Sequence, residues 1–217
     1  MGSRIKNILS YILSSILGIL CLALVTVLIY SLTGSINRQL NSNTINIETT
    51  SQLPIITSTI TKVYGISSWE AEIYGYMAMK FPYQWHDYIA LIKIESNFKT
   101  SLTSSQNCKG LTQLHPETMQ EVCKRMGIEF NNDLIWNDVL NVMVGFTYLT
   151  EAFKKDSVNA FRIYIGGPAW AKAGVEHQIT IEKYVKAINR ESEILKLVYM
   201  GLEQKEKNEA KNNLQER

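Results

Sequence analysis

The chain has few of the histidines that bind metal ions, and it lacks the excess of basic residues that binds nucleic acid. Its 217 residues include only three histidines, which stand far apart, and no HExxH or HxH grouping occurs. This scarcity disfavours a zinc site. The 22 basic residues nearly balance the 20 acidic ones and no basic face is visible, so nucleic acid is not an expected partner. We expect neither a metal ion nor an organic cofactor.

Charge is missing from one long stretch near the N-terminus. The 25 residues from Ile8 to Leu32 contain no Asp, Glu, Lys or Arg. A helix of that length, at about 1.5 Å per residue, crosses a hydrocarbon core of about 30 Å. A signal peptide would have an apolar region of only about 7–15 residues before a small-residue cleavage site. We therefore expect an uncleaved transmembrane anchor within residues 1–32, with cleavage near Ser35 as the alternative.

The charges around this run predict its orientation. Arg4 and Lys6 precede it, whereas only Arg38 follows closely. Because the more positive flank stays in the cytoplasm, the remaining segment of about 185 residues should be exported. We expect a single-pass protein of the cell (inner) membrane with a cytoplasmic N-terminus and a periplasmic or otherwise extracytoplasmic domain.

A polar segment lies on each side of the expected domain. Residues 33–66 are rich in Ser, Thr and Asn and show no helical stripe, which indicates a stalk, with short runs such as Leu53–Ile56 able to dock on the domain. Residues 201–217 carry four acidic and four basic residues and almost no apolar ones, which favours a solvated helix or tail. The domain itself is expected at residues 67–200.

The central segment is predicted to be mainly helical. Capping residues, apolar positions at helical spacing, and breaks at Pro and Gly mark the expected helices. These helices cover residues 69–81, 84–95, 116–127, 137–155, 157–164 and 180–200. No alternating strand pattern appears beyond residue 66.

A series of motifs begins at the end of the second expected helix. Glu95-Ser96-Asn97-Phe98 is followed by Ser104, then by Gly110-Leu111-Thr112-Gln113, then by Pro116 and Thr118. The series resembles the pattern of the soluble lytic transglycosylase (SLT) family, which has E-S-x-F, a serine nine residues after the glutamate, G-L-M-Q and P-x-T at the same spacing. The resemblance implies a lysozyme-like helical domain.

Later blocks agree with the resemblance, which covers about residues 90–185. Asn141–Leu149 is similar to the family's N-[IV]-x-x-G-x-x-Y-L helix, Ile163–Pro168 to its A-Y-N-A-G-P loop, and Tyr184-Val185 to its closing Y-V. Two departures stand out. Thr112 replaces the methionine of G-L-M-Q, and Ile165 replaces the asparagine of A-Y-N, which in the family is a polar substrate contact.

The resemblance implies an enzyme that cleaves peptidoglycan glycan strands without hydrolysis. In this family one glutamate protonates the bond between N-acetylmuramic acid and N-acetylglucosamine, and then takes the proton of the muramic 6-hydroxyl to leave a 1,6-anhydro end. Glu95 corresponds to that glutamate and Tyr164 to the tyrosine that orients it. Such an acid must be protonated near neutral pH, which predicts a partly apolar cleft around Glu95.

The resemblance also implies a sugar-binding groove. Its expected residues, besides Tyr164, are Ser104, Gly110, Gln113, Tyr148 and Tyr184. Loop capping is the alternative role for Ser104 and Gln113, and core packing is the alternative for Tyr148 and Tyr184.

Hydrolysis by a lysozyme-like enzyme stays open as an alternative. Most glycosidases use two carboxylates about 5–10 Å apart. No acidic residue lies within residues 96–116, and Asp87 and Asp138 remain as candidates that the fold would have to bring near Glu95. A non-catalytic module that binds glycan and scaffolds an envelope machine is another alternative, suggested by Ile165.

The cysteines raise two further points. Asn107–Leu111 has a faint likeness to the D-C-S-G-L motif of papain-like cell-wall endopeptidases, which would require a histidine such as His177 beside Cys108. In an oxidising compartment Cys108 and Cys123 are the candidate disulfide pair, with two packed thiols as the alternative.

The expected partners are peptidoglycan strands and the membrane, with an envelope secretion or conjugation complex as a candidate.

Overall fold

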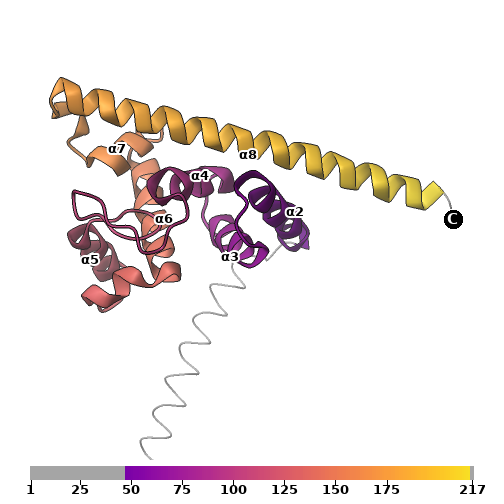
Figure 1. Ribbon diagram of the computed structural model, residues 1–217, viewed down its shortest axis with the longest axis horizontal. Coiled ribbons are helices and arrows are strands. Elements are labelled where there is room, and N and C mark those ends of the chain that lie inside the picture. Colours follow the sequence, from indigo (N-terminus) through magenta and orange to yellow (C-terminus); the bar gives the residue numbers. More distant parts are fainter. Residues whose placement is uncertain (1–46, 216–217) are drawn as a thin grey trace, which may run out of the picture. The chain divides into compact units, whose positions relative to one another are not determined.

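The computed structural model describes residues 47–215 (Figure 1). The expected anchor within residues 1–32 and the first part of the expected stalk, residues 33–46, lie outside this range. Packing is described here for the compact unit Ser51–Arg217. Within the described range, no helix is both long enough and apolar enough to cross a membrane.

The prediction of a mainly α fold is confirmed, because residues 47–215 form helices and no strand. The α-helices are α2 (Ile47–Tyr64), α3 (Ser68–Met79), α4 (Trp85–Ser96), α5 (Pro116–Arg125), α6 (Asp138–Lys155), α7 (Ala160–Gly166) and α8 (Val175–Gln215). Two 3₁₀ helices are η1 (Asn132–Trp136) and η2 (Trp170–Lys172).

Local sequence signals account for several helix starts. Ser67 forms a capping box with Glu70 at the start of α3, in which each side chain accepts a hydrogen bond from the other residue's backbone N–H. The Asn137 side chain accepts from the Leu140 amide, 2.9 Å away, at the start of α6. Pro116 occupies the first turn of α5, where its missing N–H has no cost. All three starts were predicted from the sequence.

The second half of the expected stalk is helical, and the docking expected for Leu53–Ile56 takes place within this helix. Residues 47–64 form helix α2, and Ile55, Ile56 and Ile60 of this helix are buried. A Cβ added to Gly75 of α3 would lie only 2.9 Å from the Ile56 Cγ2 atom, so the glycine lets α2 approach α3 closely. Burial of these isoleucines offsets the interior Pro54, which costs a helix about 3 kcal/mol.

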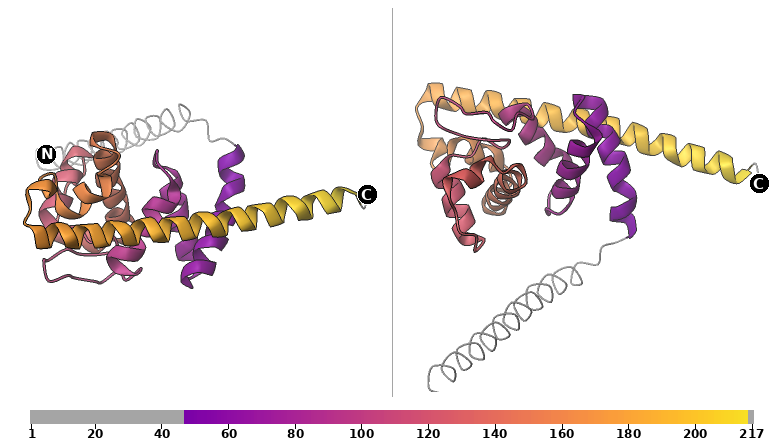
Figure 2. Two further views of the ribbon diagram at one scale, coloured as in Figure 1. Left: turned by 90° about the horizontal axis from the view of Figure 1, so that it is seen from above. Right: turned by 60° about the horizontal axis from the view of Figure 1, so that its bottom comes forward.

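Helix α4 lies at the centre of the core. Its residues from Tyr88 to Ile92 have no solvent exposure, as expected for a helix packed on all sides. The Tyr88 ring packs on Phe146 of α6, and its hydroxyl lies 2.7 Å from the Thr150 hydroxyl of the same helix. Helix α4 also packs along α8, as Figures 1 and 2 show. The helix that carries Glu95 is therefore rigidly held.

Helix α8 is longer than predicted, because it begins before residue 180 and continues through the expected tail (Figure 2). Pairs of opposite charge four residues apart run along its solvated end, with 2.9 Å between Lys207 and Glu203 and 3.7 Å between Lys205 and Glu209. Each such pair adds about 0.2–0.5 kcal/mol to a helix. This stretch is exposed, so the prediction of a solvated helix is confirmed for the residues whose side chains are described.

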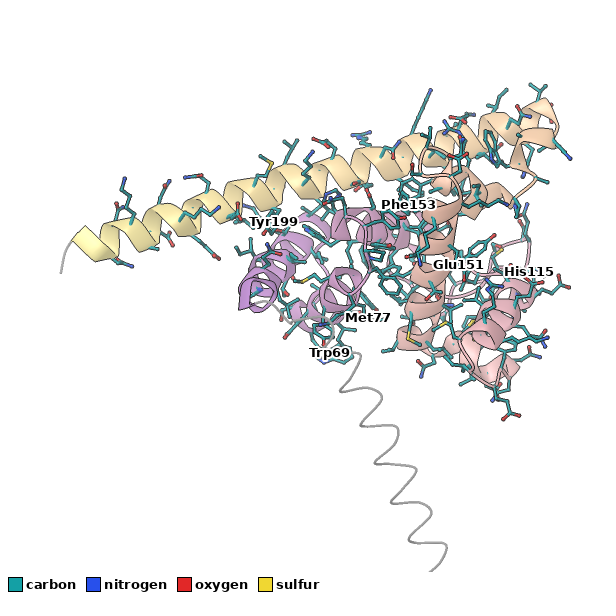
Figure 3. The ribbon with its side chains drawn as sticks, turned by 180° about the vertical axis from the view of Figure 1, so that it is seen from behind. Trp69, Met77, His115, Glu151, Phe153 and Tyr199 are labelled. Carbon is teal, nitrogen blue, oxygen red and sulfur yellow. The ribbon has the colours of Figure 1, made fainter. Side chains whose placement is uncertain are left out.

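A small polar cluster joins α8 to the start of α4. The Ser192 hydroxyl donates to the Asp87 carboxylate at 2.6 Å and lies 2.7 Å from the His86 Nδ1 atom. Beside this cluster the Tyr199 ring of α8 packs on Trp85, with 5.6 Å between ring centroids (Figure 3). Asp87 is therefore part of a helix contact.

Candidate active site

A cleft of about 530 Å³ is walled by the end of α4, the α4–α5 loop, α5, α6, α7 and the first turns of α8. Its residues combine one carboxylic acid with neutral polar, aromatic and apolar side chains. They are Glu95, Leu102, Ser104, Ser105, Gln106, Cys108, Gln113, Leu114, His115, Thr118, Tyr148, Tyr164, Ile165, Gly167, His177, Thr180, Ile181 and Tyr184. No lysine or arginine is among them.

The end of α4 places Glu95 in the cleft. Asn97 terminates the helix in the left-handed conformation, with φ of 51°, and Phe98 follows at 63°. The Phe98 ring is buried against Tyr64, with 5.1 Å between centroids. The left-handed residues thus end the helix directly after Glu95, and Phe98 anchors the chain that follows.

Glu95 is held in a state suited to proton donation. Burial raises the pKa of its carboxyl group from 4.5 to about 8, because the cleft replaces most of its water with protein atoms. No salt bridge or hydrogen bond to this carboxyl group occurs among the described residues. Glu95 is therefore largely protonated at neutral pH, as the sequence analysis expected of a general acid.

Gly110 supports the cleft from behind and does not line it. Its φ of 78° lies in the left-handed region, and an added Cβ would lie 2.4 Å from the Asn141 Nδ2 atom. Its N–H donates to the Leu102 carbonyl at 3.0 Å, which closes the α4–α5 loop. Gly110 thus has a structural role in the loop, and the expected contact between Gly110 and substrate stays a prediction.

Ser104 and Gln113 line the cleft, and both also cap the loop that carries them. The Ser104 hydroxyl accepts from the Cys108 amide at 3.1 Å. The Gln113 side-chain amide donates to the carbonyls of Leu102 and Gly110 at 3.1 and 2.8 Å. The capping role left open for both residues is present. The Gln113 Oε1 atom accepts no hydrogen bond from the described residues and is available to a sugar hydroxyl.

The three expected tyrosines lie in the cleft wall. Tyr148 and Tyr164 pack on each other with 5.3 Å between ring centroids. Tyr184 is 41% exposed, which excludes core packing for it. The Tyr164 hydroxyl donates to the Thr112 carbonyl at 2.8 Å, and no hydrogen bond to Glu95 is present, in contrast to the expected orienting contact. Burial and, next, the nearby Glu95 raise the pKa of Tyr164.

Two histidines also line the cleft: sequence reasoning missed His115 and considered His177 only as a partner of Cys108. His115 precedes the first turn of α5 (Figure 3), and His177 lies in the first turn of α8. Helical spacing back from Tyr184 would have found His177, because it lies seven residues earlier on the same face as Ile181. His115 lies in the irregular segment between Gln113 and α5, so no regular spacing of residues would have identified it.

Cys108 and Cys123 are free thiols in the structure, so the candidate disulfide is not formed. Cys108 lines the cleft, whereas Cys123 is fully buried on the core side of α5. Burial raises the pKa of both thiols, and for Cys108 the Ser104 hydrogen bond opposes this rise while Glu95 adds to it. A thiol whose pKa is raised is a poor nucleophile, which argues against the endopeptidase alternative.

The α5 wall of the cleft is fastened to α6 by an ion pair. The Arg125 Nη2 atom donates to a Glu151 carboxylate oxygen at 2.6 Å, and the Arg125 Nε atom donates to the other at 3.2 Å. Figure 3 shows Glu151 on α6 and His115 at the start of α5. Neither charge lines the cleft, which keeps Glu95 as its only carboxylic acid among the described residues.

Part of the chain, including Glu95, matches the model of a known protein family. The family model described as the Transglycosylase SLT domain matches residues 76–167, from within α3 to the end of α7. No curated protein matches the chain significantly.

Two solved structures are similar to parts of the chain. The 70 kDa soluble lytic transglycosylase of Escherichia coli is 16% identical, with a TM-score of 0.44 over 60% of this chain and 23% of that one. An inactive mutant of the lytic transglycosylase Slt of Pseudomonas aeruginosa is 18% identical, with a TM-score of 0.38 over 69% of this chain and 24% of that one. The chain thus spans about a quarter of either protein. The match to the SLT family model is confined to residues 76–167, and this range includes Glu95.

Proposed function

We propose that the protein is a peptidoglycan lytic transglycosylase that cleaves the bond between N-acetylmuramic acid and N-acetylglucosamine and leaves 1,6-anhydromuramic ends. One observation carries the proposal: Glu95 is the single carboxylic acid of a cleft that, among the described residues, has no other carboxylate and no lysine or arginine, and burial there raises its pKa to about 8. The SLT domain match supports the same type of function.

In the proposed mechanism Glu95 acts twice. The protonated carboxyl group first gives its proton to the glycosidic oxygen, and the bond from this oxygen to muramic C1 breaks as C1 gains oxocarbenium character. The resulting Glu95 carboxylate then takes the proton of the muramic 6-hydroxyl while O6 bonds to C1. Glu95 ends protonated, no water is consumed, and the nucleophile belongs to the substrate, which gives it a high effective concentration.

The placement of the acidic residues favours this reaction over hydrolysis. Hydrolysis by the common routes needs a second carboxylate about 5–10 Å from the acid. Asp87 is bonded to Ser192 at the far end of α4, and neither Asp87 nor Asp138 lines the cleft. The lysozyme-like alternative therefore lacks its second catalytic group among the described residues.

The remaining surface of the cleft suits an uncharged saccharide. Tyr148 and Tyr184 offer ring surfaces for sugar faces, and the Gln113 Oε1 atom offers an acceptor for a hydroxyl group. Ile165 lines the same wall and gives it an apolar patch where the family pattern has a polar contact. We infer that this protein makes fewer polar contacts with its glycan at that point than the family pattern implies.

The nature of the product tests the proposal. Full-length protein incubated with purified sacculi should release muropeptides with 1,6-anhydromuramic ends, identified by mass spectrometry. Glu95→Gln removes the transferable proton and should reduce the rate by at least about 10²-fold. Cys108→Ala, the control, should keep most of the activity because no thiolate takes part.

Each other outcome indicates a different function. Reducing ends would identify a lysozyme-like hydrolase, and cut peptides together with loss of activity in Cys108→Ala would identify an endopeptidase. Binding of glycan without any cleavage by the wild type would leave the scaffold function.

A further inference from the structure

We propose that Arg162 and Glu182 are positioning residues for glycan binding: their ion pair sets the rotation of α8 about its own axis and thereby places His177 in the wall of the cleft. The inference rests on the proposed function for the identity of the ligand, but the contacts that carry it are independent of the reaction.

The first turns of α8 have a cleft face and a buried face side by side. His177, Thr180 and Tyr184 line the cleft. Ile181 and Val185 are buried, with 0% and 6% of their surface exposed. Successive residues of a helix are about 100° apart around its axis, so the two sets form neighbouring stripes. A rotation of α8 would therefore move the first set out of the cleft wall.

The opposite edge of the buried stripe carries the bonds that prevent this rotation. Neither Gln178 nor Glu182 lines the cleft. The Arg162 Nη2 atom of α7 donates to one Glu182 carboxylate oxygen at 2.9 Å, and its Nε atom donates to the other. The Gln178 side-chain amide donates to the carbonyls of Ala171 and Ala173 at 3.0 and 2.8 Å. Both sets of bonds hold the edge of α8 that faces away from the cleft.

Arg162 is itself held in one position on α7. Its Nη1 atom donates to the Val158 carbonyl at 3.3 Å and to the Asn159 side-chain oxygen at 3.1 Å. Its guanidinium group lies over the Trp170 ring, with 5.5 Å between the Arg162 Cζ atom and the ring centroid. A forked contact of guanidinium with carboxylate fixes direction as well as distance, because both carboxylate oxygens are engaged. The pair is therefore suited to orienting a helix.

Gly166 lets the two helices meet closely beside this pair. A Cβ added to Gly166 would lie 2.5 Å from the Ile181 Cδ1 atom and 2.9 Å from the Trp170 Cβ atom. Both distances are too short for real atoms. Figure 1 shows α7 beside the first turns of α8, and the two helices are in contact. This approach fixes how far α8 lies from α7, and the ion pair fixes how α8 is turned.

His177 is the side chain through which we expect the ion pair to act on the ligand. Among the described residues, nothing forms a hydrogen bond or salt bridge with its ring nitrogens. A neutral imidazole offers one donor and one acceptor, which suits the hydroxyl and acetamido groups of a glycan. The family match ends at residue 167, before α8 begins, so the family model does not include this contact.

Binding of glycan tests the proposal apart from catalysis. The parent is full-length Glu95→Gln, titrated with soluble, uncrosslinked glycan strands in a calorimeter. Glu182→Arg or Arg162→Glu, added singly, should each raise Kd by on the order of 10-fold, the equivalent of one lost hydrogen bond. The exchanged pair R162E/E182R should return Kd to within about 3-fold of the parent, because it restores the attraction with the charges reversed.

His177→Ala shows whether the ion pair acts through the histidine. This change should also weaken binding, and Glu182→Arg should cost less in its presence than in its absence. In protein that retains Glu95, the variants of the ion pair should raise KM and leave kcat nearly unchanged, because the acid is not displaced.

Glu203→Arg is the matched control for the charge reversals. It breaks the ion pair with Lys207, 2.9 Å away on the solvated end of the same helix, and should leave Kd unchanged. Hydrogen exchange adds a measurement that needs no ligand. Amides of residues 178–185 should exchange faster in Glu182→Gln than in wild type, whereas those of residues 186–198 should not change. This measurement decides the matter even if a charge reversal prevents folding.

Three results would overturn the proposal. The first is an unchanged Kd in both single charge reversals. The second is an exchanged pair that binds no better than the single variants, because the losses would then come from the separate charges. The third is unchanged exchange of residues 178–185 in Glu182→Gln. A wild-type protein that yields no anhydro ends, while Kd and exchange respond as expected, would overturn the proposed reaction alone.

Discussion

Glu95 shows at the scale of one residue how a site suited to catalysis weakens the fold that carries it. The carboxyl group is enclosed without a cation or donor, and its pKa rises from 4.5 to about 8. Between these two values the unfolded chain has released the proton while the folded chain retains it. Stability therefore falls as pH rises through this window, the opposite of the usual behaviour of a carboxylate with a depressed pKa.

Glu95→Gln should consequently stabilise the protein at alkaline pH. At pH 8 its melting temperature should exceed that of wild type by about 3 °C or more, and the difference should vanish near pH 4. Thermal unfolding followed by circular dichroism at both pH values measures this.

Glu182→Gln is the matched control for that prediction. Its hydrogen bonds to Arg162 hold the pKa of Glu182 below its usual value, so the glutamine variant should be less stable than wild type at pH 8. An E95Q protein that melts with wild type at every pH would show that Glu95 is ionised and solvated in the folded state.

At the scale of the elements, α4 and α8 together position the site. Helix α4 presents Glu95 at one end and is fixed at the other by the cluster of His86, Asp87 and Ser192. Helix α8 supplies one wall of the cleft with His177 and Tyr184 and then runs along α4. Ser192 is 6% exposed, and its hydroxyl lies within hydrogen-bond distance of both His86 and Asp87.

Ser192→Ala should therefore destabilise the fold by about 1 kcal/mol, the usual net contribution of a hydrogen bond between side chains. Urea denaturation measures the change, and Gln204→Ala serves as the control. Gln204 bonds only to Asn208 on the exposed end of α8, so its removal should change stability by less than about 0.5 kcal/mol. An S192A protein as stable as this control would mean that the cluster contributes nothing to the contact between the helices.

At the scale of the whole molecule, the proposed substrate lies outside the cytoplasm, which agrees with the topology that the sequence predicts. We propose that residues 8–32 anchor the chain in the cell membrane and that the SLT domain is exported. The support for this is the uncharged run and the position of Arg4 and Lys6 before it.

Fusions at the C-terminus test this topology. Alkaline phosphatase joined after Arg217 should be active, and green fluorescent protein exported by the general secretory route should stay dark. The fusion should remain with membranes through a carbonate wash, and deletion of residues 8–32 should abolish both phosphatase activity and membrane retention. Release of the intact fusion by carbonate would contradict an anchor, and shortening by about 35 residues would identify a cleaved signal peptide.

Much of the helical structure and most of the cleft could be predicted, because their signals are local. Asn137 and Pro116 mark helix starts through bonds within a single turn. The spacing from Glu95 to Gln113 places both in the cleft because the loop between them closes on itself. Helix α2 was missed because its apolar side chains are few and threonine-rich sequence surrounds them. Its burial depends on Gly75 of α3, which is distant in the sequence and lets the two helices approach closely.

The sequence by itself determined the helical class and the motif that contains Glu95, whereas the structure decided that neither Asp87 nor Asp138 lines the cleft. Only the tertiary structure decided which groups surround that acid. The contact of Tyr164 with the Thr112 carbonyl, the structural role of Gly110 and the placement of His115 and His177 all join segments far apart in the chain. The protonated state of Glu95 belongs to this second group, because exclusion of water from a carboxyl group is a property of the packing of several helices around it.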